Sequence, residues 1–198
     1  MFKWLYCIIY YLLIASCNSM PTLKDRSHYW LAKTFTYQID GSLDTESAGL
    51  IRSALNDIES KTCVRFNERD IRDPITSFEF ITYIIPGGRE MRRSCGRSSG
   101  YPGSAQRVAF NSGCSKNRQA ILHETCHALG FHHEHQRPDR NIYIRVRLSN
   151  TLNDRGKRAG VIRNDFDPYV PYDYLSIMHM YSFSLSVCLF FRIFSKFK

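Results

Sequence analysis

Residues 121–135, ILHETCHALGFHHEH, hold five of the chain's seven histidines. His123 and His127 stand four positions apart, so on a helix their side chains project from one face, one turn apart. Gly130 follows, and glycine readily takes the left-handed backbone conformation that ends a helix and reverses the chain. A fold for this chain must therefore contain a helix that stops at Gly130 and a turn that brings His133 back toward His127.

The same spacing describes a metal site. In the pattern HExxH, two histidines bind Zn²⁺ and the glutamate between them, here Glu124, serves as general base. His133, three residues after Gly130, supplies a third imidazole. The sequence thus predicts one zinc ion per chain, bound by His123, His127 and His133, with Glu124 as the catalytic residue.

The other residues of this stretch are expected to have roles other than binding zinc. His132 and His135 do not stand at ligand spacing and are expected on the surface or beside the ligands. Cys126 is expected to pack as a small apolar residue. A competing interpretation is that all these histidines only hydrogen-bond to their neighbours on a partly buried helix. The glycine and the third histidine at fixed spacing favour the metal site.

Hydrophobic patterning predicts the elements around this helix. Residues 34–39, TFTYQI, alternate apolar and polar side chains, as a half-buried strand does. Apolar residues at steps of three and four between about residues 44 and 61 predict an amphipathic helix. Further strands and a second helix are expected at residues 78–85, 107–110 and 116–129.

Length and charge limit the classes of protein. A chain of 198 residues suits one domain with a sizeable core, or two small subdomains sharing a cleft. The net charge of +9 suits an acidic partner. Because the basic residues are scattered rather than gathered in one patch, we do not expect a nucleic-acid partner.

The first nineteen residues place Lys3 ahead of an apolar stretch. This layout predicts a signal peptide over residues 1–19 and a secreted, extracellular protein, since the stretch is too short and wrongly flanked for a stable membrane span. A lipid-carrying Cys17 is the alternative. Residues 20–29 are expected to be a short pro-segment or connector. An oxidising compartment favours disulfides, and a Cys95–Cys114 bridge would close the loop between these cysteines.

Two longer motifs carry a family resemblance. The run HETCHALGFHHEHQRPDR resembles the signature of the astacin family of secreted zinc endopeptidases. Beyond the zinc ligands, the matching positions are Gly130, Phe131, Glu134, Arg137, Asp139 and Arg140. Downstream, YDYLSIMH resembles the family's Met-turn, with Met178 beneath the zinc site. The similarity runs from about Trp30 to Ser184.

The resemblance implies an α+β fold of the zincin/metzincin type. It implies an upper subdomain with a twisted mixed sheet and two long helices, and a less regular, here incomplete, lower subdomain after Gly130. A polypeptide substrate would lie extended between the subdomains, with acidic residues near the scissile bond. The resemblance also implies a Cys95–Cys114 bridge, a bridge from Cys63 to a late cysteine, and a contact of Glu134 with the amino terminus that activation exposes.

Three features depart from the family's pattern. The family has a tyrosine directly after Met-His, whereas this chain has Met180 and then Tyr181. The family's tyrosine acts as an oxyanion donor, and loss of one such donor typically lowers turnover by about 10²–10³. Tyr181, one residue later in this chain, is the remaining candidate for the donor. Residues 185–198 form a divergent apolar and basic tail containing Cys188. In the family an acidic residue of the pro-segment reaches the zinc and keeps the enzyme latent, and Asp25 is the only acidic residue between Met20 and Trp30 for that contact.

Three hypotheses follow from these observations. The first is a secreted zinc endopeptidase in which Glu124 takes a proton from the attacking water and passes it to the leaving amine. The second is a zinc-binding but catalytically silent relative that acts as a secreted binding or decoy protein, which Met180 favours. The third, a basic surface-binding protein with an accidental motif, requires that no zinc binds. Zinc binding and peptide hydrolysis together discriminate among them.

Overall fold

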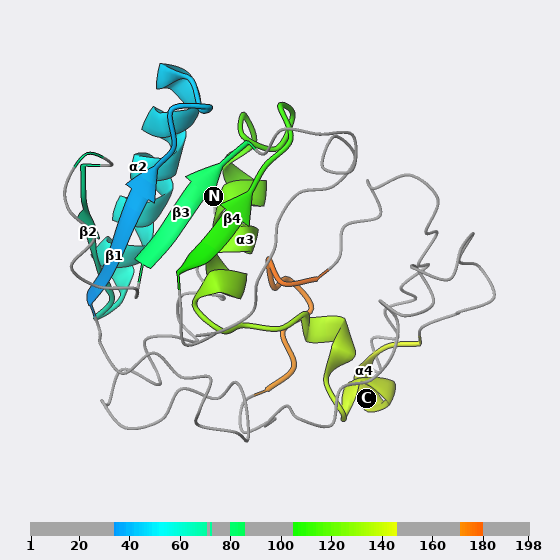
Figure 1. Cartoon of the computed structure of the whole chain (residues 1–198). Helices are drawn as coiled ribbons and strands as arrows, with labels where there is room; N and C mark the ends of the chain where they lie inside the picture. The colour runs from blue at the N-terminus through cyan, green and yellow to red at the C-terminus, as the bar shows by residue number, and fades with distance from the viewer. Residues whose placement is uncertain (1–33, 71, 73–79, 86–104, 146–170, 180–198) are drawn as a thin grey trace.

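The computed structural model of the protein describes residues 34–70, 72, 80–85, 105–145 and 171–179 (Figure 1). Its elements are, in chain order, β1 (Thr34–Ile39), α2 (Thr45–Lys61), β2 (Arg65–Glu68), β3 (Phe80–Ile84), β4 (Gln106–Ala109), α3 (Arg118–Ala128), η3 (Glu134–Gln136) and α4 (Arg140–Tyr143). The strands form one sheet with α2 and α3 on the same face, and the short elements η3 and α4 follow α3 away from the sheet. The α+β class is confirmed.

The sheet has four strands in the order β2-β1-β3-β4. Each neighbouring pair runs parallel, with Thr36 opposite Phe80 and Ile81 opposite Gln106. The antiparallel strand of the expected mixed sheet is not among the residues described. Strand β3 is buried over Phe80–Tyr83 on both faces, as a central strand of a parallel sheet is.

Strand β2 is a strand of the sheet that the sequence did not predict, and the short elements η3 and α4 were not predicted either. It lies at the sheet edge beside β1, and its four residues RFNE are mostly exposed. Only Phe66 packs against the core, where its ring lies 5.8 Å from that of Phe35. With a single apolar side chain directed inward, the segment carries no alternation from which a strand is recognised.

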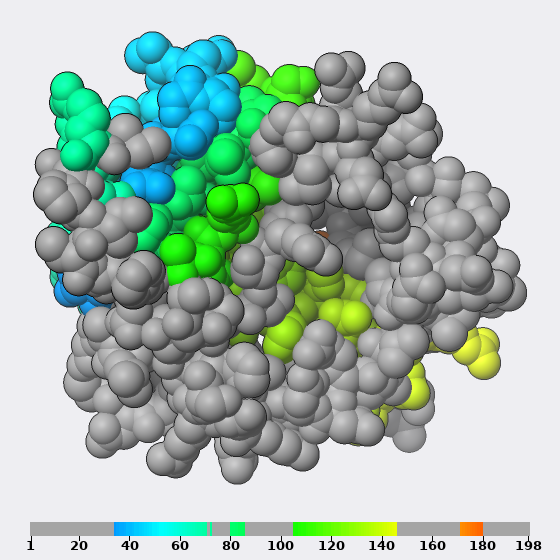
Figure 2. Space-filling model, viewed as in Figure 1, coloured from blue at the N-terminus to red at the C-terminus, as the bar shows by residue number. Residues whose placement is uncertain are grey.

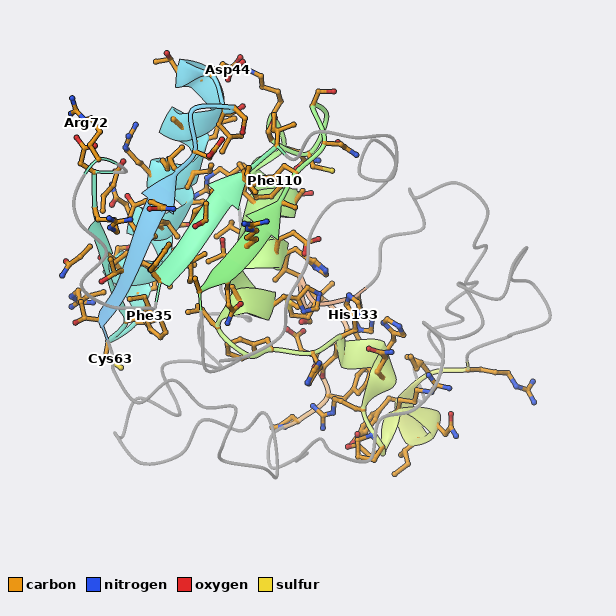
Figure 3. The ribbon with its side chains drawn as sticks, in the orientation of Figure 1. Phe35, Asp44, Cys63, Arg72, Phe110 and His133 are labelled. Carbon is orange, nitrogen blue, oxygen red and sulfur yellow. The ribbon has the colours of Figure 1, made fainter. Side chains whose placement is uncertain are left out.

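Helix α2 begins and packs as its pattern indicates. The Asp44 carboxylate caps its first turn by accepting a hydrogen bond from the Ser47 backbone N–H at 2.8 Å. The predicted stripe, including Ile51, Leu55 and Ile58, is buried in the core. Figure 3 shows Asp44 and Cys63 at opposite ends of this helix.

Aromatic side chains fill the centre of the core. The rings of Tyr83 and Phe110 stack with centroids 6.2 Å apart, and Tyr37 meets Tyr83 edge to face at 6.0 Å. Phe35 and Phe110, labelled in Figure 3, lie near the two ends of the sheet. Against this layer α3 packs Ile121 and Leu122, together with its neighbour α2. The sheet thus fixes one side of the helix that carries the histidine motif.

Both ends of α3 are closed by local hydrogen bonds. The Asn117 side chain accepts from the backbone N–H groups of Gln119 and Ala120 at the start. At the end, the N–H of Gly130 donates to the His127 carbonyl and that of Phe131 to the Cys126 carbonyl, each at 2.9 Å. This pair of bonds is the Schellman motif, and Gly130 has the positive φ of 106° that it requires. The predicted stop at Gly130 is confirmed.

The segment that follows this turn reaches the surface beside the sheet. Figure 2 shows residues near β4 and residues of the segment after Gly130 on the same face of the molecule.

Among the helices described, none is long and apolar enough to cross a membrane.

Candidate metal centre

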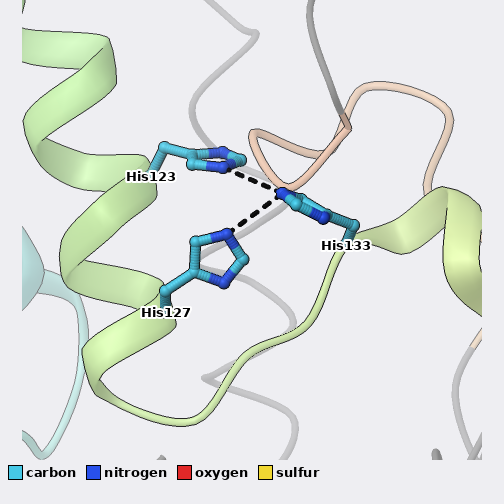
Figure 4. Close-up of side chains that lie close together, drawn as sticks. All are labelled: His123, His127 and His133. Carbon is cyan, nitrogen blue, oxygen red and sulfur yellow. Dashed lines mark hydrogen bonds between the residues drawn. The ribbon is translucent and has the colours of Figure 1, made fainter. Parts of the chain in front are cut away.

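Three imidazoles converge where α3 ends. His133 Nε2 lies 3.0 Å from His127 Nε2 and 3.3 Å from His123 Nε2. The potential ligand atoms of all three lie within 4.8 Å of one another (Figure 4). His123 and His127 project from one face of α3, and the turn at Gly130 returns His133 to face them. The structure therefore brings together the predicted ligands His123, His127 and His133.

The opposite ring nitrogens show which form of each imidazole is present. Nδ1 of His123 lies 2.7 Å from the Ile177 carbonyl oxygen, and Nδ1 of His127 lies 2.7 Å from that of Phe131. Nδ1 of His133 lies 3.2 Å from Oε1 of Gln136. Because these oxygens only accept, each Nδ1 carries the proton and each Nε2 presents a lone pair.

This arrangement fits a zinc ion. The Nε2 lone pair of His133 lies 3.0 Å from that of His127 and 3.3 Å from that of His123, and lone pairs cannot hydrogen-bond to one another, so a cation between the three rings satisfies all of them. Tetrahedral zinc with Zn–N bonds of about 2.0–2.1 Å places its nitrogen ligands about 3.3 Å apart. The observed separations of 3.0 and 3.3 Å match that requirement. The cofactor that this donor set holds is one Zn²⁺.

Burial keeps the ligands in the neutral form that binds metal. It lowers the pKa of His123, and with the neighbouring histidines it lowers that of His127 to about 3. The pKa of His133 is lowered further, again chiefly by burial. A neutral imidazole is the form that coordinates zinc, so the site does not need to lose ring protons at neutral pH before it binds the ion.

Glu124 lies on α3 directly after His123 and is only 8% exposed. Its carboxylate makes no hydrogen bond or ion pair within the part of the chain that the structure describes. Burial raises its pKa to about 7. An isolated carboxylate with such a pKa is suited to exchange protons with water near neutral pH.

The segment 171–178 forms the support of the site. Met178 is buried, and its carbonyl accepts the Glu134 backbone N–H at 3.0 Å. The Glu134 carboxylate in turn accepts the Asp173 backbone N–H at 3.0 Å. The predicted Met-turn residue thus lies beside the ligand loop, and the same segment supplies the Ile177 carbonyl that orients His123.

The remaining predicted residues divide into three groups. His132 and His135 are both buried, so the surface alternative is wrong for them; the ring of His135 stacks on that of His133 at 5.1 Å. Cys63 is exposed and free. The predictions for Cys95 with Cys114 and for Met180 and Tyr181 stay predictions, because Cys95, Met180 and Tyr181 lie outside the described residues.

Several groups at the site were not predicted. Two of the three atoms that fix the ring tautomers are backbone carbonyls, at Phe131 and Ile177, and a carbonyl leaves no signal in a sequence. Gln136 stands three residues after His133, a spacing that places it on the same side of one helical turn. That spacing was the only available indication of its role.

These features define a zinc-binding protein of the α+β metzincin class. The family model Astacin, which describes a peptidase family, matches residues 22–191. The chain therefore belongs to the astacin family.

Individual proteins agree with this assignment. The chain is 33% identical over 145 residues to the low choriolytic enzyme of Oryzias latipes, covering 72% of this chain and 48% of that protein. It is 32% identical over 166 residues to the zinc metalloproteinase nas-4 of Caenorhabditis elegans, covering 82% and 50%. The structure of high choriolytic enzyme 1, a hatching enzyme zinc-protease from Oryzias latipes, superposes with a TM-score of 0.67 at 29% identity, covering 82% of this chain and 77% of that one. The chain spans about half the length of the first two relatives.

Proposed function

We propose that the protein is a secreted zinc-dependent endopeptidase that hydrolyses peptide bonds within polypeptides. The observation that carries the proposal is the position of Glu124, a buried carboxylate without a partner in the described structure, on the same helix as two converging imidazoles. The names of two similar proteins, a zinc metalloproteinase and a hatching enzyme zinc-protease, support it. The apolar stretch after Lys3 supports secretion.

The chain's own residues supply the acid–base part of the reaction. Bound zinc supplies Lewis acidity toward a carbonyl oxygen and lowers the pKa of water. Glu124, whose pKa burial raises to about 7, accepts a proton from the attacking water and then donates it to the leaving amine. His123, His127 and His133 hold the ion through Nε2, while their Nδ1 contacts fix the ring orientations.

The charge of the chain indicates a substrate preference. A net charge of +9 favours polypeptides with acidic residues near the scissile bond. A panel of peptides that differ only in acidic or neutral residues beside the scissile bond tests this preference. Faster hydrolysis of the acidic members, with an advantage that falls as salt rises, is the expected result. Equal rates across the panel would contradict it.

Peptide hydrolysis by the full chain tests the proposed activity. We expect zinc-loaded protein to cleave a fluorogenic peptide and Glu124→Gln to lower turnover by about 10²–10⁴ while zinc binding persists. Glu46→Gln is the matched control, because Glu46 is an exposed α2 residue that pairs with Lys116. Removal of the metal by a chelator is expected to abolish hydrolysis. Equal activity of wild type and Glu124→Gln would exclude the proposed role of Glu124.

A catalytically silent zinc-binding protein is the second candidate. It is favoured by one observation, Met180 at the position where the family resemblance implies a tyrosine. This candidate predicts one zinc per wild-type chain without peptide hydrolysis. Met180→Tyr then tests the cause: a gain of hydrolysis in this variant alone would support silencing by Met180.

A further inference from the structure

Arg137 is among the largest fully buried side chains in the part of the chain that the structure describes, with 1% of its surface exposed. A charged side chain is rarely buried to this extent unless it is fully paired. Its Nε and Nη2 donate to the two carboxylate oxygens of Asp139 at 3.0 and 2.9 Å, and Nη1 donates to Glu134 Oε1 at 2.9 Å. Nη1 also lies 3.4 Å from the Pro171 carbonyl oxygen, and the guanidinium lies over the Tyr172 ring at 5.3 Å. One guanidinium thus joins two carboxylates, a carbonyl and an aromatic ring.

These partners lie on two segments that are distant in the sequence. Glu134 and Asp139 belong to the segment after His133, while Pro171 and Tyr172 begin the segment 171–178. A bond from backbone to side chain extends the same junction: the Asp173 N–H donates to the Glu134 carboxylate at 3.0 Å. The guanidinium is therefore the buried centre of the contact between segments 134–139 and 171–178.

Both segments hold zinc ligands in place. Glu134 directly follows His133, and its backbone N–H donates to the Met178 carbonyl at 3.0 Å. The neighbouring Ile177 carbonyl accepts from Nδ1 of His123 at 2.7 Å. If segment 171–178 shifted relative to segment 134–139, the Ile177 carbonyl would no longer hold His123 in the same orientation relative to His133. The geometry of the three imidazoles would therefore change.

We propose that Arg137 is a positioning residue for the zinc centre, which orients His123 and His133 by clamping segment 134–139 to segment 171–178. The inference rests on the proposed zinc site and adds to it a residue outside the ligand set. Arginine is required because a planar guanidinium binds a carboxylate with two parallel bonds and stacks on a ring at the same time. A lysine ammonium retains the charge and can lie over a ring, but it cannot bind a carboxylate with two parallel bonds, so Arg137→Lys separates positioning from simple charge balance.

Zinc affinity of the full chain, measured by competition with a chromophoric chelator, tests the proposal. We expect Arg137→Lys to weaken zinc binding by about 10–100-fold, the range typical of groups that orient metal ligands. We also expect the visible absorption of the Co²⁺-substituted variant to change in intensity and position, because ligand geometry sets that spectrum. A residue that only stabilised the fold would lower the midpoint of unfolding of the metal-free protein without changing the Co²⁺ spectrum.

Arg52→Lys is the matched control. Arg52 also makes a two-bond contact to a carboxylate, that of Glu68, at 2.7 and 2.6 Å, but it does so on α2. The Arg52→Lys substitution is expected to leave zinc affinity and the Co²⁺ spectrum unchanged.

If Arg137→Lys fails to fold, Asp139→Asn is measured in its place. This substitution keeps the shape of the side chain but removes the carboxylate charge that faces Arg137. A smaller loss of zinc affinity is then expected.

The outcomes separate this inference from the proposed function. The inference, but not the proposed function, would be overturned if Arg137→Lys kept the zinc affinity and the Co²⁺ spectrum of the wild type. The same holds for Asp139→Asn if that variant is used in place of Arg137→Lys. Failure of the wild type to bind zinc would overturn both. Wild type that binds zinc without hydrolysing peptides would contradict only the proposed activity, because affinity and spectrum still report on the role of Arg137.

Discussion

The hydroxyl of Tyr83 lies 3.1 Å from Oγ1 of Thr125, inside the core where β3 meets α3. The Thr125 hydroxyl donates to the Ile121 carbonyl at 2.8 Å, so the Tyr83 hydroxyl is the donor to Thr125. Burial raises the pKa of Tyr83 and keeps this donor protonated. Since Thr125 directly follows Glu124, the contact ties the helix that carries the general base to the sheet.

Tyr83→Phe is expected to lower the free energy of unfolding by about 1 kcal/mol, the typical contribution of one buried hydrogen bond. Zinc affinity should stay at the wild-type value, because the ring still stacks on Phe110. Urea denaturation with a parallel zinc titration measures both quantities. Unchanged stability would show that the Tyr83 hydroxyl contributes nothing to this packing.

Gly130→Ala is expected to destabilise the protein by about 1–2 kcal/mol, because φ at this residue is 106° and a Cβ is strained there. Zinc affinity should fall as well, since the turn sets the positions of the Phe131 carbonyl and of His133. Gly49→Ala is the control with the opposite sign. Gly49 lies in α2, where an added Cβ meets nothing within 4 Å, and alanine is expected to stabilise the helix by about 0.5–1 kcal/mol. Equal effects of the two substitutions would contradict the assigned turn.

Asp57 joins the two helices and should make stability depend on pH. Burial alone would raise its pKa, but hydrogen bonds from Lys61 at 2.6 Å and Arg118 at 2.8 Å lower the pKa below 3.8 overall. A carboxyl with a lowered folded-state pKa stabilises the fold above its unfolded pKa and loses that contribution as pH falls.

The wild type should therefore exceed Asp57→Asn in stability by about 0.2–1 kcal/mol at pH 6. This difference should shrink as pH falls from about 5 toward 3. Thermal or urea unfolding of both proteins across this range provides the comparison. A constant difference over the whole range would disprove the assigned ion pairs.

Gln136→Leu removes the acceptor of the His133 Nδ1 proton, which lies 3.2 Å away. We expect zinc affinity to fall by about 10-fold or more, because groups that orient a ligating imidazole typically have effects of 10–100-fold. Gln119→Leu, at an exposed position on α3, should have no such effect. Equal zinc affinities in the two variants would refute the role given to Gln136.

Local patterns were sufficient to predict much of the fold. The alternation in TFTYQI predicted β1, the apolar stripe predicted α2, and the histidine spacing with Gly130 predicted the helix and turn of the zinc site. Each of these depends on contacts within a few residues. Strand β2 was missed because its pairing with β1, rather than its own side chains, makes it a strand.

Long-range contacts explain what the sequence could not predict at the site. The burial of Arg137 depends on Pro171 and Tyr172, and the orientation of His123 depends on the Ile177 carbonyl, far along the chain. His135 has no ligand spacing, yet it is wholly buried against His133. No periodicity links these positions, so only the tertiary structure brings them together.

Zinc content of the purified full chain, compared with that of His133→Ala and His132→Ala, tests the central claim most directly. The two substitutions are adjacent and chemically identical, but only His133 directs its Nε2 toward those of His123 and His127. We expect one tightly bound zinc per chain in the wild type and in His132→Ala, and a loss of affinity of at least about 100-fold in His133→Ala. Absence of zinc from the wild type, or wild-type affinity in His133→Ala, would contradict the account.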